Sequence, residues 1–412
     1  MIFSIAWKNV WRNKLRSLII ILSITLGLLG GIFYLAFANG MAQQQISSSI
    51  KTYISNIQIH HPQYLINNEI TYTIDKPLEK LNAIRATEGV KAASSRLVSL
   101  AMASSAITGT GISIDGIDPE VELNVTDINT KLVEGSFFDS KLKNQILIGQ
   151  KLANKLKIKI KSKLVITIQN SAGDIAYGAF RVVGIFKTHN SDFDQFNVYV
   201  KKKDLSKLIG VDENTVNEIA VILTHNDLTN EVKEKIKSDF SDDISAKILT
   251  VRSWDEIQPV LRMLNEMTIQ FSMIFLMIIL VALSFGIINT MLMAIMERVR
   301  EIGMLMAIGM NKVRVFFMIL LETVFLSLTG GIIGLTLSYL VVKITGYNGI
   351  DLSIVGEGLN AMGYSAFVYP ELDDIYYLMI VGLVIVTALF ASILPARKAL
   401  KFNPAEAVRH DV

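Results

Sequence analysis

The sequence predicts an α+β membrane protein, with four transmembrane helices and a large α+β extracytoplasmic domain between helices 1 and 2. The first observation is the composition of the 412 residues, of which 51% are hydrophobic and only 19% are charged. A soluble domain is usually less apolar and more charged. The second is that the apolar residues gather in four blocks, each long enough for the roughly 20 residues of helix that cross a bilayer. A long polar segment separates the first block from the second.

The four blocks give the expected division of the chain. Three of them contain no charged side chain, and residues 315–342 contain one, Glu322. The first block follows a basic segment, as a signal peptide would, but it is too long and lacks a clear cleavage site, so we expect a retained anchor. The expected segments are an interfacial helix 1–17, transmembrane helix 1 at 18–38, an outer domain with stalk at 39–266, helix 2 at 267–296, a cytoplasmic helix at 297–314, helix 3 at 315–342, an outer loop at 343–374, helix 4 at 375–396 and a tail at 397–412.

The charges of the short flanks predict the orientation. Residues 1–17 carry four basic side chains and no acidic one, and basic residues also flank the spans in 297–314 and 397–412. The 344–374 loop carries five acidic side chains and no basic one. Basic flanks stay on the cytoplasmic side of a membrane. We therefore expect both termini in the cytoplasm and the acidic loop outside.

Residues 1–17 predict an amphipathic helix that contacts membrane lipids. Phe3, Trp7 and Trp11 share one helix face, and Arg12 and Arg16 belong to a basic row on another. Tryptophan is enriched at headgroup depth, which favours a helix lying on the inner surface of the membrane. A basic flank with no further role is the alternative.

The second block is longer than a membrane requires. Its 30 residues would reach about 45 Å as a helix. The surplus predicts a stalk that continues above the membrane. The amphipathic residues 251–267 fit the same continuous helix, and Pro259 could kink its start.

The outer segment predicts an ordinary solvated α+β domain. Its strand-like stretches are short, β-branched and bounded by Gly, Asn or Asp. The expected strands are SNIQIHH, GISIDGI, QILIG, KLVITIQ, AFRVVGIFKT, NVYVK and EIAVILT, and the expected helices lie at 77–87, 149–157 and 228–240. Lysines alternate with apolar residues over 155–163, which predicts an edge strand whose lysines block pairing with another edge.

Catalytic and cofactor motifs are missing from the sequence. It has no cysteine and no Gly-Lys dipeptide, so it has no thiolate metal site and no Walker A loop. We expect no catalytic residue, no cofactor and no metal in this chain. The net charge of +3 gives no indication of nucleic-acid binding.

Several residues inside the spans suggest packing or function. Gly27 and Gly31 form one GxxxG pattern, and Gly330 and Gly334 form another; both allow close helix approach within or between subunits. Glu322 is an acid within a span, which predicts a functional residue. It also lies only eight residues after Arg314, so an acid at headgroup level paired with a basic neighbour is an equal alternative.

The charged segment between the second and third blocks predicts a short cytoplasmic helix that docks on a soluble partner. Ile302 and Met306 can share one helix face, and Gly303 and Gly309 leave the backbone open to close contact. We expect Ile302, Leu305 and Met306 to be the anchors buried in the partner. The surrounding charges Glu297, Arg298, Arg300 and Glu301 would pair with basic or acidic neighbours of the segment and fix its orientation. A plain turn between two spans is the alternative.

Three segments resemble ABC transporter permeases of the MacB, FtsX and LolC/LolE type. They are ERVREIGMLMAIGM at 297–310, ETVFLSLTGGIIGL at 322–335 and LPARKALKFNPAEAVR at 394–409. The order of one span, a large outer domain and three spans is also similar. The resemblance implies that residues 297–309 are a coupling helix, that ATP and Mg²⁺ are bound by a separate cytoplasmic ATPase, and that a second permease, the same or a different chain, completes the transporter. Such permeases work by mechanotransmission.

The start of the outer domain, residues 39–64, looks most similar to the lipoprotein-releasing permeases. That similarity implies a lipoprotein substrate and a periplasmic carrier. Two alternatives stay open: FtsX-like signalling to a cell-wall hydrolase, and MacB-like efflux of peptides or drugs.

Overall fold

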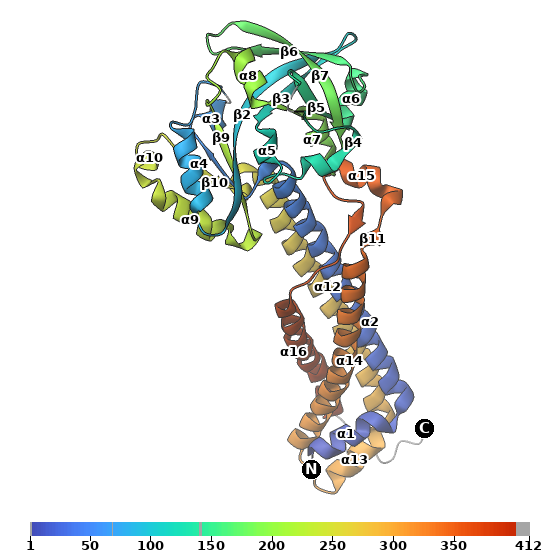
Figure 1. Ribbon diagram of the computed structural model, residues 1–412. Coiled ribbons are helices and arrows are strands. Elements are labelled where there is room, and N and C mark those ends of the chain that lie inside the picture. The colour runs from blue at the N-terminus through green and yellow to red at the C-terminus, as the bar shows by residue number, and fades with distance from the viewer. Residues whose placement is uncertain (1, 68, 140–141, 401–412) are drawn as a thin grey trace. The chain divides into compact units, whose positions relative to one another are not determined.

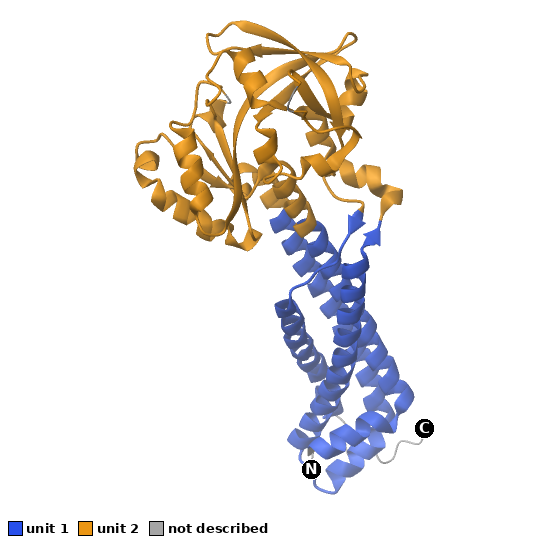
Figure 2. Ribbon diagram, in the orientation of Figure 1, with its two compact units in different colours: residues 1–42, 265–351, 367–412 blue, residues 43–264, 352–366 orange. Residues whose placement is uncertain are grey.

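The structure is a computed structural model that describes residues 2–67, 69–139 and 142–400 (Figure 1). The chain forms two compact units, coloured separately in Figure 2. The first unit consists of residues 1–42, 265–351 and 367–412, and the second consists of residues 43–264 and 352–366. Residues 401–412, which include most of the expected tail and the end of the third resembling segment, lie outside the described residues.

The first unit is helical. Its helices are α1 (Ile2–Arg12), α2 (Lys14–Ser49), α12 (Pro259–Glu297), α13 (Val299–Ala307), α14 (Lys312–Asn348) and α16 (Asp374–Ala399), and a short ladder joins β11 (Ile350–Asp351) to β12 (Phe367–Val368). Four of the helices, α2, α12, α14 and α16, are long and apolar enough to cross a membrane, which confirms the predicted fold class. They share a core that contains Ile24, Leu28 and Ile319.

Two helices differ from the expected boundaries. α2 continues to Ser49, well past residue 38, so it extends beyond its apolar block, as α12 does. The stalk of α12 starts only at Pro259, because residues 250–253 form strand β10, paired with β1, and Trp254–Ile257 form the short helix α11. The expectation of one continuous helix from residue 251 was therefore wrong. Proline lacks an amide hydrogen and suits the first turn of a helix, so Pro259 begins the helix and does not kink it.

The second unit is built on a sheet with the order β10-β1-β9-β2-β3-β8-β5-β7-β4, and β6 pairs with both β2 and β7. The strands are β1 (Ile57–His60), β2 (Val90–Ser104), β3 (Gly109–Ile117), β4 (Leu132–Gly135), β5 (Gln145–Gly149), β6 (Lys163–Gln169), β7 (Ile175–Phe186), β8 (Asn197–Lys201), β9 (Glu218–Leu223) and β10 (Thr250–Ser253). The helical segments are η1 (Ile50–Ile54), α3 (Tyr64–Asn67), α4 (Pro77–Ala86), α5 (Pro119–Glu122), η2 (Ile128–Lys131), α6 (Gln150–Leu156), α7 (Ser191–Phe196), α8 (Lys202–Ile209), η3 (Asn226–Leu228), α9 (Thr229–Asp239), α10 (Ser241–Ser245), α11 (Trp254–Ile257), η4 (Ser353–Val355) and α15 (Gly356–Ala361).

Strand β2 joins two cores of this unit. Its first half pairs with β9, and Ala93 belongs to a core with α4 and α9. Its second half pairs with β3 and β6, and Ala103 belongs to a core with α6 and α8. A strand of 15 residues can serve both cores because its two ends lie in different parts of the sheet.

A buried charge cluster fixes β2 to its neighbours. Arg96 is 3% exposed and donates to Glu122 at 2.6 Å and to Glu218 at 2.7 Å. Half-buried Asp115 lies nearby on β3 and accepts a hydrogen bond from Ser113. Burial, followed by the charge of Glu218, raises the pKa of Asp115 to about 7. A buried guanidinium held by two carboxylates is fully paired, which is the condition under which a buried charge is tolerated.

The lysine run 155–163 is not an edge strand. Helix α6 ends at Leu156, and Lys157 and Lys161 adopt positive φ values of 53° and 70°. Strand β6 begins only at Lys163. Alternation of lysine and apolar residues predicted a strand, but two left-handed residues turn the chain between α6 and β6.

Candidate functional site

Helix α13 connects two membrane helices through two short joints. α12 ends at Glu297, and Arg298 alone separates it from α13 with φ −112° and ψ 21°. After α13 the chain turns at Gly309, whose φ of +103° favours glycine. Asn311 then caps α14 by accepting a hydrogen bond from the amide of Val313 at 3.2 Å. The predicted short helix therefore exists, but it begins two residues after Glu297, and Gly309 serves the turn.

The face of α13 that carries Ile302 points into the protein itself. Ile302 is 3% exposed, Gly303 is buried, and Met306 packs against the core of the helical unit. Leu305 is half-buried. The expectation that Ile302, Leu305 and Met306 are anchors for a partner is corrected accordingly. The apolar stripe was identified correctly as one helix face, but the helices of this chain cover it.

The opposite face of α13 is open. Met304 is 50% exposed and Ile308 is 86% exposed, and Arg300 and Ala307 are also exposed. Val313, at the start of α14, continues this apolar surface along the chain with 57% exposure. We call Arg300, Met304, Ala307 and Ile308 the α13 tip. Exposed apolar residues grouped on a short helix are typical of a docking surface.

Six charged side chains tie the α13 joint to the neighbouring helices. We call them the joint network: Arg12 of α1, Arg16 of α2, Glu297 of α12, Arg298 at the joint, Glu301 of α13 and Glu322 of α14. Three guanidinium groups face three carboxylates, so the formal charges cancel. The network therefore links five helices and carries no net charge.

Glu322 is the buried centre of this network. Its side chain is 3% exposed, and its two oxygens accept from Nη1 of Arg298 at 3.0 and 3.2 Å. Nη2 of Arg16 lies 3.6 Å from the same carboxylate. The sequence left two interpretations of Glu322 open, a functional acid within a span and an acid paired with a basic neighbour. The structure shows the ion pairs, but the partners are Arg298 and Arg16 and not Arg314. Both partners belong to the joint network, so these ion pairs connect α14 to the α13 joint and to α2.

The outer part of the network is more exposed. Glu301 accepts from Nε of Arg298 at 3.1 Å and from Arg12, and Glu297 lies 3.5 Å from Nη1 of Arg16. Burial opposes ionisation of Glu301, but the hydrogen bonds from Arg12 and Arg298 outweigh it and lower the pKa of this carboxyl. The expected pairing within the segment therefore holds for Arg298 and Glu301, whereas Glu297 pairs with α2.

Arg12 and Arg16 were missed as members of the site. The sequence showed them as a basic row on the N-terminal helix, and the signal that pointed to them was Glu322, an acid in a span that needs a cation. The structure interrupts the helix at Asn13, so Arg12 ends α1 and Arg16 lies in the first turn of α2. This break allows the two guanidiniums to reach different carboxylates.

The first glycine pair lies against α12 of the same chain. A Cβ on Gly27 would lie 2.8 Å from Cδ2 of Leu283, and one on Gly31 would lie 3.0 Å from Cδ1 of Ile279. Both distances are shorter than ordinary carbon contacts, but the obstructing atoms are ends of flexible side chains. The pair therefore allows α2 and α12 to approach, without excluding a small adjustment.

The second glycine pair brings α14 against the backbone of α2. A Cβ on Gly330 would lie 3.1 Å from the carbonyl oxygen of Ile21, and one on Gly334 would lie 3.1 Å from Cα of Thr25. The hydroxyl of Thr25 also donates to the carbonyl oxygen of Gly330 at 3.2 Å. Backbone atoms cannot move aside, so these two glycines set the distance between α2 and α14.

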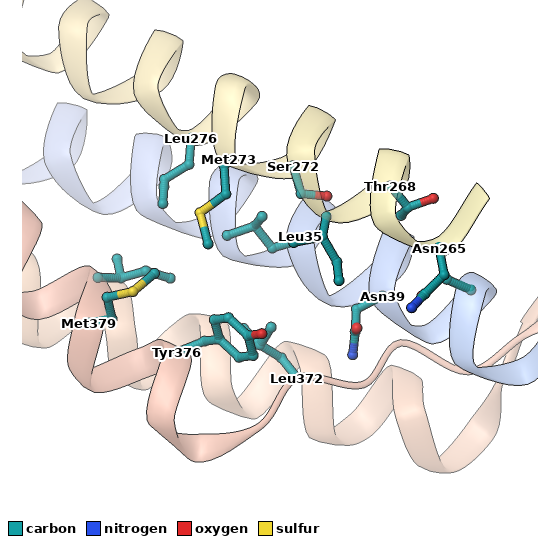
Figure 3. Close-up of a pocket in the computed structure, with 13 residues that line it drawn as sticks. Leu35, Asn39, Asn265, Thr268, Ser272, Met273, Leu276, Leu372, Tyr376 and Met379 are labelled. Carbon is teal, nitrogen blue, oxygen red and sulfur yellow. The ribbon is translucent and has the colours of Figure 1, made fainter. Parts of the chain in front are cut away.

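A small pocket lies between α2, α12 and α16, as Figure 3 shows. Asn39, Asn265 and Tyr376 place polar groups around it, and Met273 and Met379 line its apolar side. The space in it that a water-sized sphere can reach is about 40 Å³. We assign no ligand to this pocket.

Two family models match the chain. A model described as the MacB-like periplasmic core domain matches residues 17–239, more than half of the chain, and one described as the FtsX-like permease C-terminal domain matches residues 273–404. The chain belongs to the MacB- and FtsX-type ABC transporter permeases. The FtsX-like match contains α13, most of the joint network and the second glycine pair, and the α+β unit lies largely within the MacB-like match.

Relatives of known name cover nearly the whole chain. An uncharacterised ABC transporter permease of Methanocaldococcus jannaschii is 26% identical over 99% of this chain and 97% of its own length. The lipoprotein-releasing system transmembrane protein LolC of Haemophilus influenzae is 22% identical over 95% of this chain and 92% of its own. The macrolide export ATP-binding/permease protein MacB of Shewanella sp. is 22% identical over 99% of this chain, which spans 60% of the MacB length.

Proposed function

We propose that this permease transmits mechanical work from a separate cytoplasmic ATPase to its α+β domain, with no catalysis of its own. ATP and Mg²⁺ would be bound by the ATPase, and a second permease, of the same or a different chain, would complete the transporter. Both termini and α13 would lie in the cytoplasm, and the chain would lie in a bacterial inner membrane. The observation that supports this best is the joint network, because it ties the short helix α13 to α2, α12 and α14, three of the four long helices.

The α13 tip is the proposed contact with the ATPase. Its exposed side chains are apolar except for Arg300, so Met304 and Ile308 would be buried in a groove of the partner. Truncation of central apolar anchors usually weakens an interface more than loss of a rim charge does. The family of the chain indicates an ATPase partner, and the tip is the part of α13 not covered by the chain itself.

Co-purification tests this contact. Met304→Asp/Ile308→Asp should abolish retention of the ATPase that co-purifies with the wild-type permease, while the α+β domain keeps its fold. A matched control is Met362→Asp/Ile354→Asp, because these residues are 69% and 100% exposed but lie in the 352–366 segment. Retention of the ATPase by the first variant, with full cellular function, would show that α13 is only a connecting turn.

For the substrate, we propose release of a lipoprotein from the inner membrane to a periplasmic carrier. The supporting observation is the relative named as a lipoprotein-releasing protein, which matches this chain over nearly its whole length without a further domain. Mass spectrometry of the native complex, purified in mild detergent, tests this directly. An acylated protein bound to wild-type complex and released by ATP supports the proposal. A bound hydrolase would favour signalling, and a peptide or drug would favour efflux; either result without an acylated protein would refute it.

A further inference from the structure

Arg16 of the joint network is buried but loosely held. Its side chain is only 10% exposed, yet its guanidinium makes no hydrogen bond within the part of the chain that the structure describes. Nη1 lies 3.5 Å from Glu297, Nη2 lies 3.6 Å from Glu322, and Nε has no partner. Charge-assisted hydrogen bonds of this kind measure about 2.7–2.9 Å. Arg16 therefore stops about 0.8 Å short of a direct bond to Glu322.

Another buried guanidinium of this chain shows what satisfied pairing is. Arg96 of the α+β unit donates to Glu122 at 2.6 Å and to Glu218 at 2.7 Å. Most buried polar groups in proteins are paired in this way, and an exception asks for an explanation. Arg16 has five N–H donors and two carboxylates beside it, so its lack of hydrogen bonds is such an exception.

The explanation is that Arg298 occupies the carboxylate that Arg16 faces. Both oxygens of Glu322 accept from the same Nη1 atom of Arg298, at 3.0 and 3.2 Å. That atom therefore lies at the edge between the two oxygens. The strongest pairing of an arginine with a carboxylate is bidentate and uses both oxygens of this edge at once. Arg16 can take the edge only when Arg298 has left it.

Each of the two arginines has a second acid. Arg298 also donates to Glu301 at 3.1 Å, and Arg16 also lies 3.5 Å from Glu297. Whichever arginine holds Glu322, the other keeps a carboxylate beside it, and no buried charge is left alone. Two arrangements that pair the same charges differ little in energy, which is the condition for a two-state element.

We propose that Glu322 passes from Arg298 to Arg16 when α13 moves away from α14. In the structure α14 is tied to the α13 joint; after the exchange it would be tied to α2, and Arg298 would keep Glu301. A permanent, purely structural role of Arg16 would explain the balance of charges. It would not explain a buried guanidinium without a hydrogen bond beside a carboxylate. The exchange is a property of this chain, and its use in transmission rests on the proposed function.

The packing of α2 on α14 gives the exchange a mechanical consequence. Gly330 and Gly334 bring the backbones of the two helices together, and the hydroxyl of Thr25 donates to the carbonyl oxygen of Gly330 at 3.2 Å. Glu322 lies eight residues before Gly330, about 12 Å along α14. Closure of the gap between Arg16 and Glu322 would therefore tilt α14 toward α2 about the glycine contact.

A triple-mutant cycle on the full-length chain alone tests the exchange. The coupling between Arg16→Gln and Glu322→Gln is measured by unfolding with sodium dodecyl sulfate in mixed micelles, first in the wild type and then in an Arg298→Gln background. Because Arg298 holds the carboxylate edge in the wild type, we expect a weak coupling there. Removal of Arg298 frees that edge, so the coupling, as a ratio of unfolding equilibrium constants, should rise at least about fivefold.

The matched control is the coupling between Arg12 and Glu301 in the same two backgrounds. Arg12 already donates to Glu301, so no new bond becomes available to it when Arg298 is removed. This coupling should change by less than about twofold. If the coupling between Arg16 and Glu322 stays the same or falls in the Arg298→Gln background, Arg16 is a fixed member of the network and the proposal is wrong.

Arg298→Lys provides a second test that keeps the charge of the joint. Arg298 holds Glu301 through Nε and Glu322 through Nη1, whereas a lysine has one ammonium for both. Nitrogen–proton NMR spectra of the chain in micelles report the Nε–H group of Arg16, assigned by its absence from Arg16→Gln. We expect this signal to shift downfield in Arg298→Lys, because the group gains a carboxylate. A signal at its wild-type position would overturn the exchange, whether or not Arg298→Gln folds.

The role in transmission is tested separately in the assembled transporter. At wild-type levels in the membrane, Arg16→Gln should retain the ATPase, because the α13 tip is unchanged, but should lose most of its cellular function. Full function of this variant would overturn the use of the exchange in transmission. A wrong assignment of the α13 contact is reported by Met304→Asp/Ile308→Asp instead, so the two failures are distinguishable.

Discussion

Replacement of Glu322 by glutamine is the most direct test of the joint network. The substitution keeps the size of the side chain and removes its charge. Arg298 would lose the carboxylate that now accepts from it at 3.0 and 3.2 Å. Arg16 would keep only Glu297, at 3.5 Å, and its Nε atom already has no partner among the described residues. Two guanidiniums that are about nine-tenths buried would then face a neutral amide.

The expected cost follows from this burial. Removal of one partner from a buried ion pair costs about 3–5 kcal/mol, because the remaining charge is left uncompensated. Arg298 retains Glu301 as a second partner, so we expect a value near the lower end, about 3 kcal/mol. Glu301→Gln is the matched control, because the Glu301 side chain is 42% exposed, one partner is the half-exposed Arg12, and its other partner, Arg298, would keep Glu322. An exposed pair contributes only about 0–1 kcal/mol.

Unfolding by sodium dodecyl sulfate in mixed micelles, followed by circular dichroism, measures both free energies. The double variant Glu322→Gln/Arg298→Gln should lose less than the sum of the single losses, with a coupling of about 1–3 kcal/mol. If Glu322→Gln costs no more than Glu301→Gln, or if the single losses add, then burial does not make Glu322 the centre of the network and the reasoning fails.

Three further predictions concern other parts of the molecule. Asp115→Asn should raise the free energy of unfolding of the α+β unit at pH 8 by up to about 4 kcal/mol and change it little near pH 4. The pKa of Asp115 is about 7 in the folded protein, above its unfolded value, so the folded state favours the neutral carboxyl. The wild type therefore loses stability as the pH rises from about 4 through 7, and the asparagine variant does not. Pulse proteolysis across this range measures the difference, and a gain independent of pH would contradict it. Gly330→Leu should destabilise the helical unit by about 1–3 kcal/mol, since its Cβ meets backbone. Gly30→Leu, with nothing within 4 Å, should have little effect in the same unfolding assay, and equal losses would refute the packing argument. An impermeant maleimide applied to intact cells should label Lys202→Cys and not Lys312→Cys, in a chain without native cysteine, and the opposite pattern would overturn the topology.

The sequence was sufficient wherever one local pattern determined one element. Apolar blocks predicted the four long helices, and all seven expected strands of the α+β unit are present. It failed where pairing between distant segments decides the structure. Strand β2 has few β-branched residues and many Ala and Ser, so its sequence predicts no strand; three partner strands, β3, β6 and β9, hold it in place. The lysine run shows the opposite error, because alternation alone does not supply a partner strand.

The same distinction applies to the site. Sequence periodicity correctly grouped Ile302 and Met306 on one face of a short helix, but it could not say whether a partner or the chain itself covers that face. Glu322 indicated a missing cation, and the nearest candidate along the chain was Arg314. The structure supplies Arg298 from the α13 joint and Arg16 from α2, which lie 24 and 306 residues away in sequence. Such partners are determined by tertiary packing, which a single sequence does not contain.

The position of the network explains why a short helix could move long ones. Apolar packing alone would hold Ile302 in the core but would allow α13 to slide, because apolar contacts have little directional preference. Ion pairs with fixed donors and acceptors restrict that sliding.

Arg298 is both the only residue between α12 and α13 and the donor to Glu301 and Glu322. A force applied to the α13 tip would therefore act on α12 through the backbone and on α14 through the Arg298–Glu322 pair. Arg16 connects the same carboxylate to α2. α2 and α12, which both continue well beyond their apolar blocks, are thus held at the joint together with α14, as the proposed mechanotransmission to the outer domain requires.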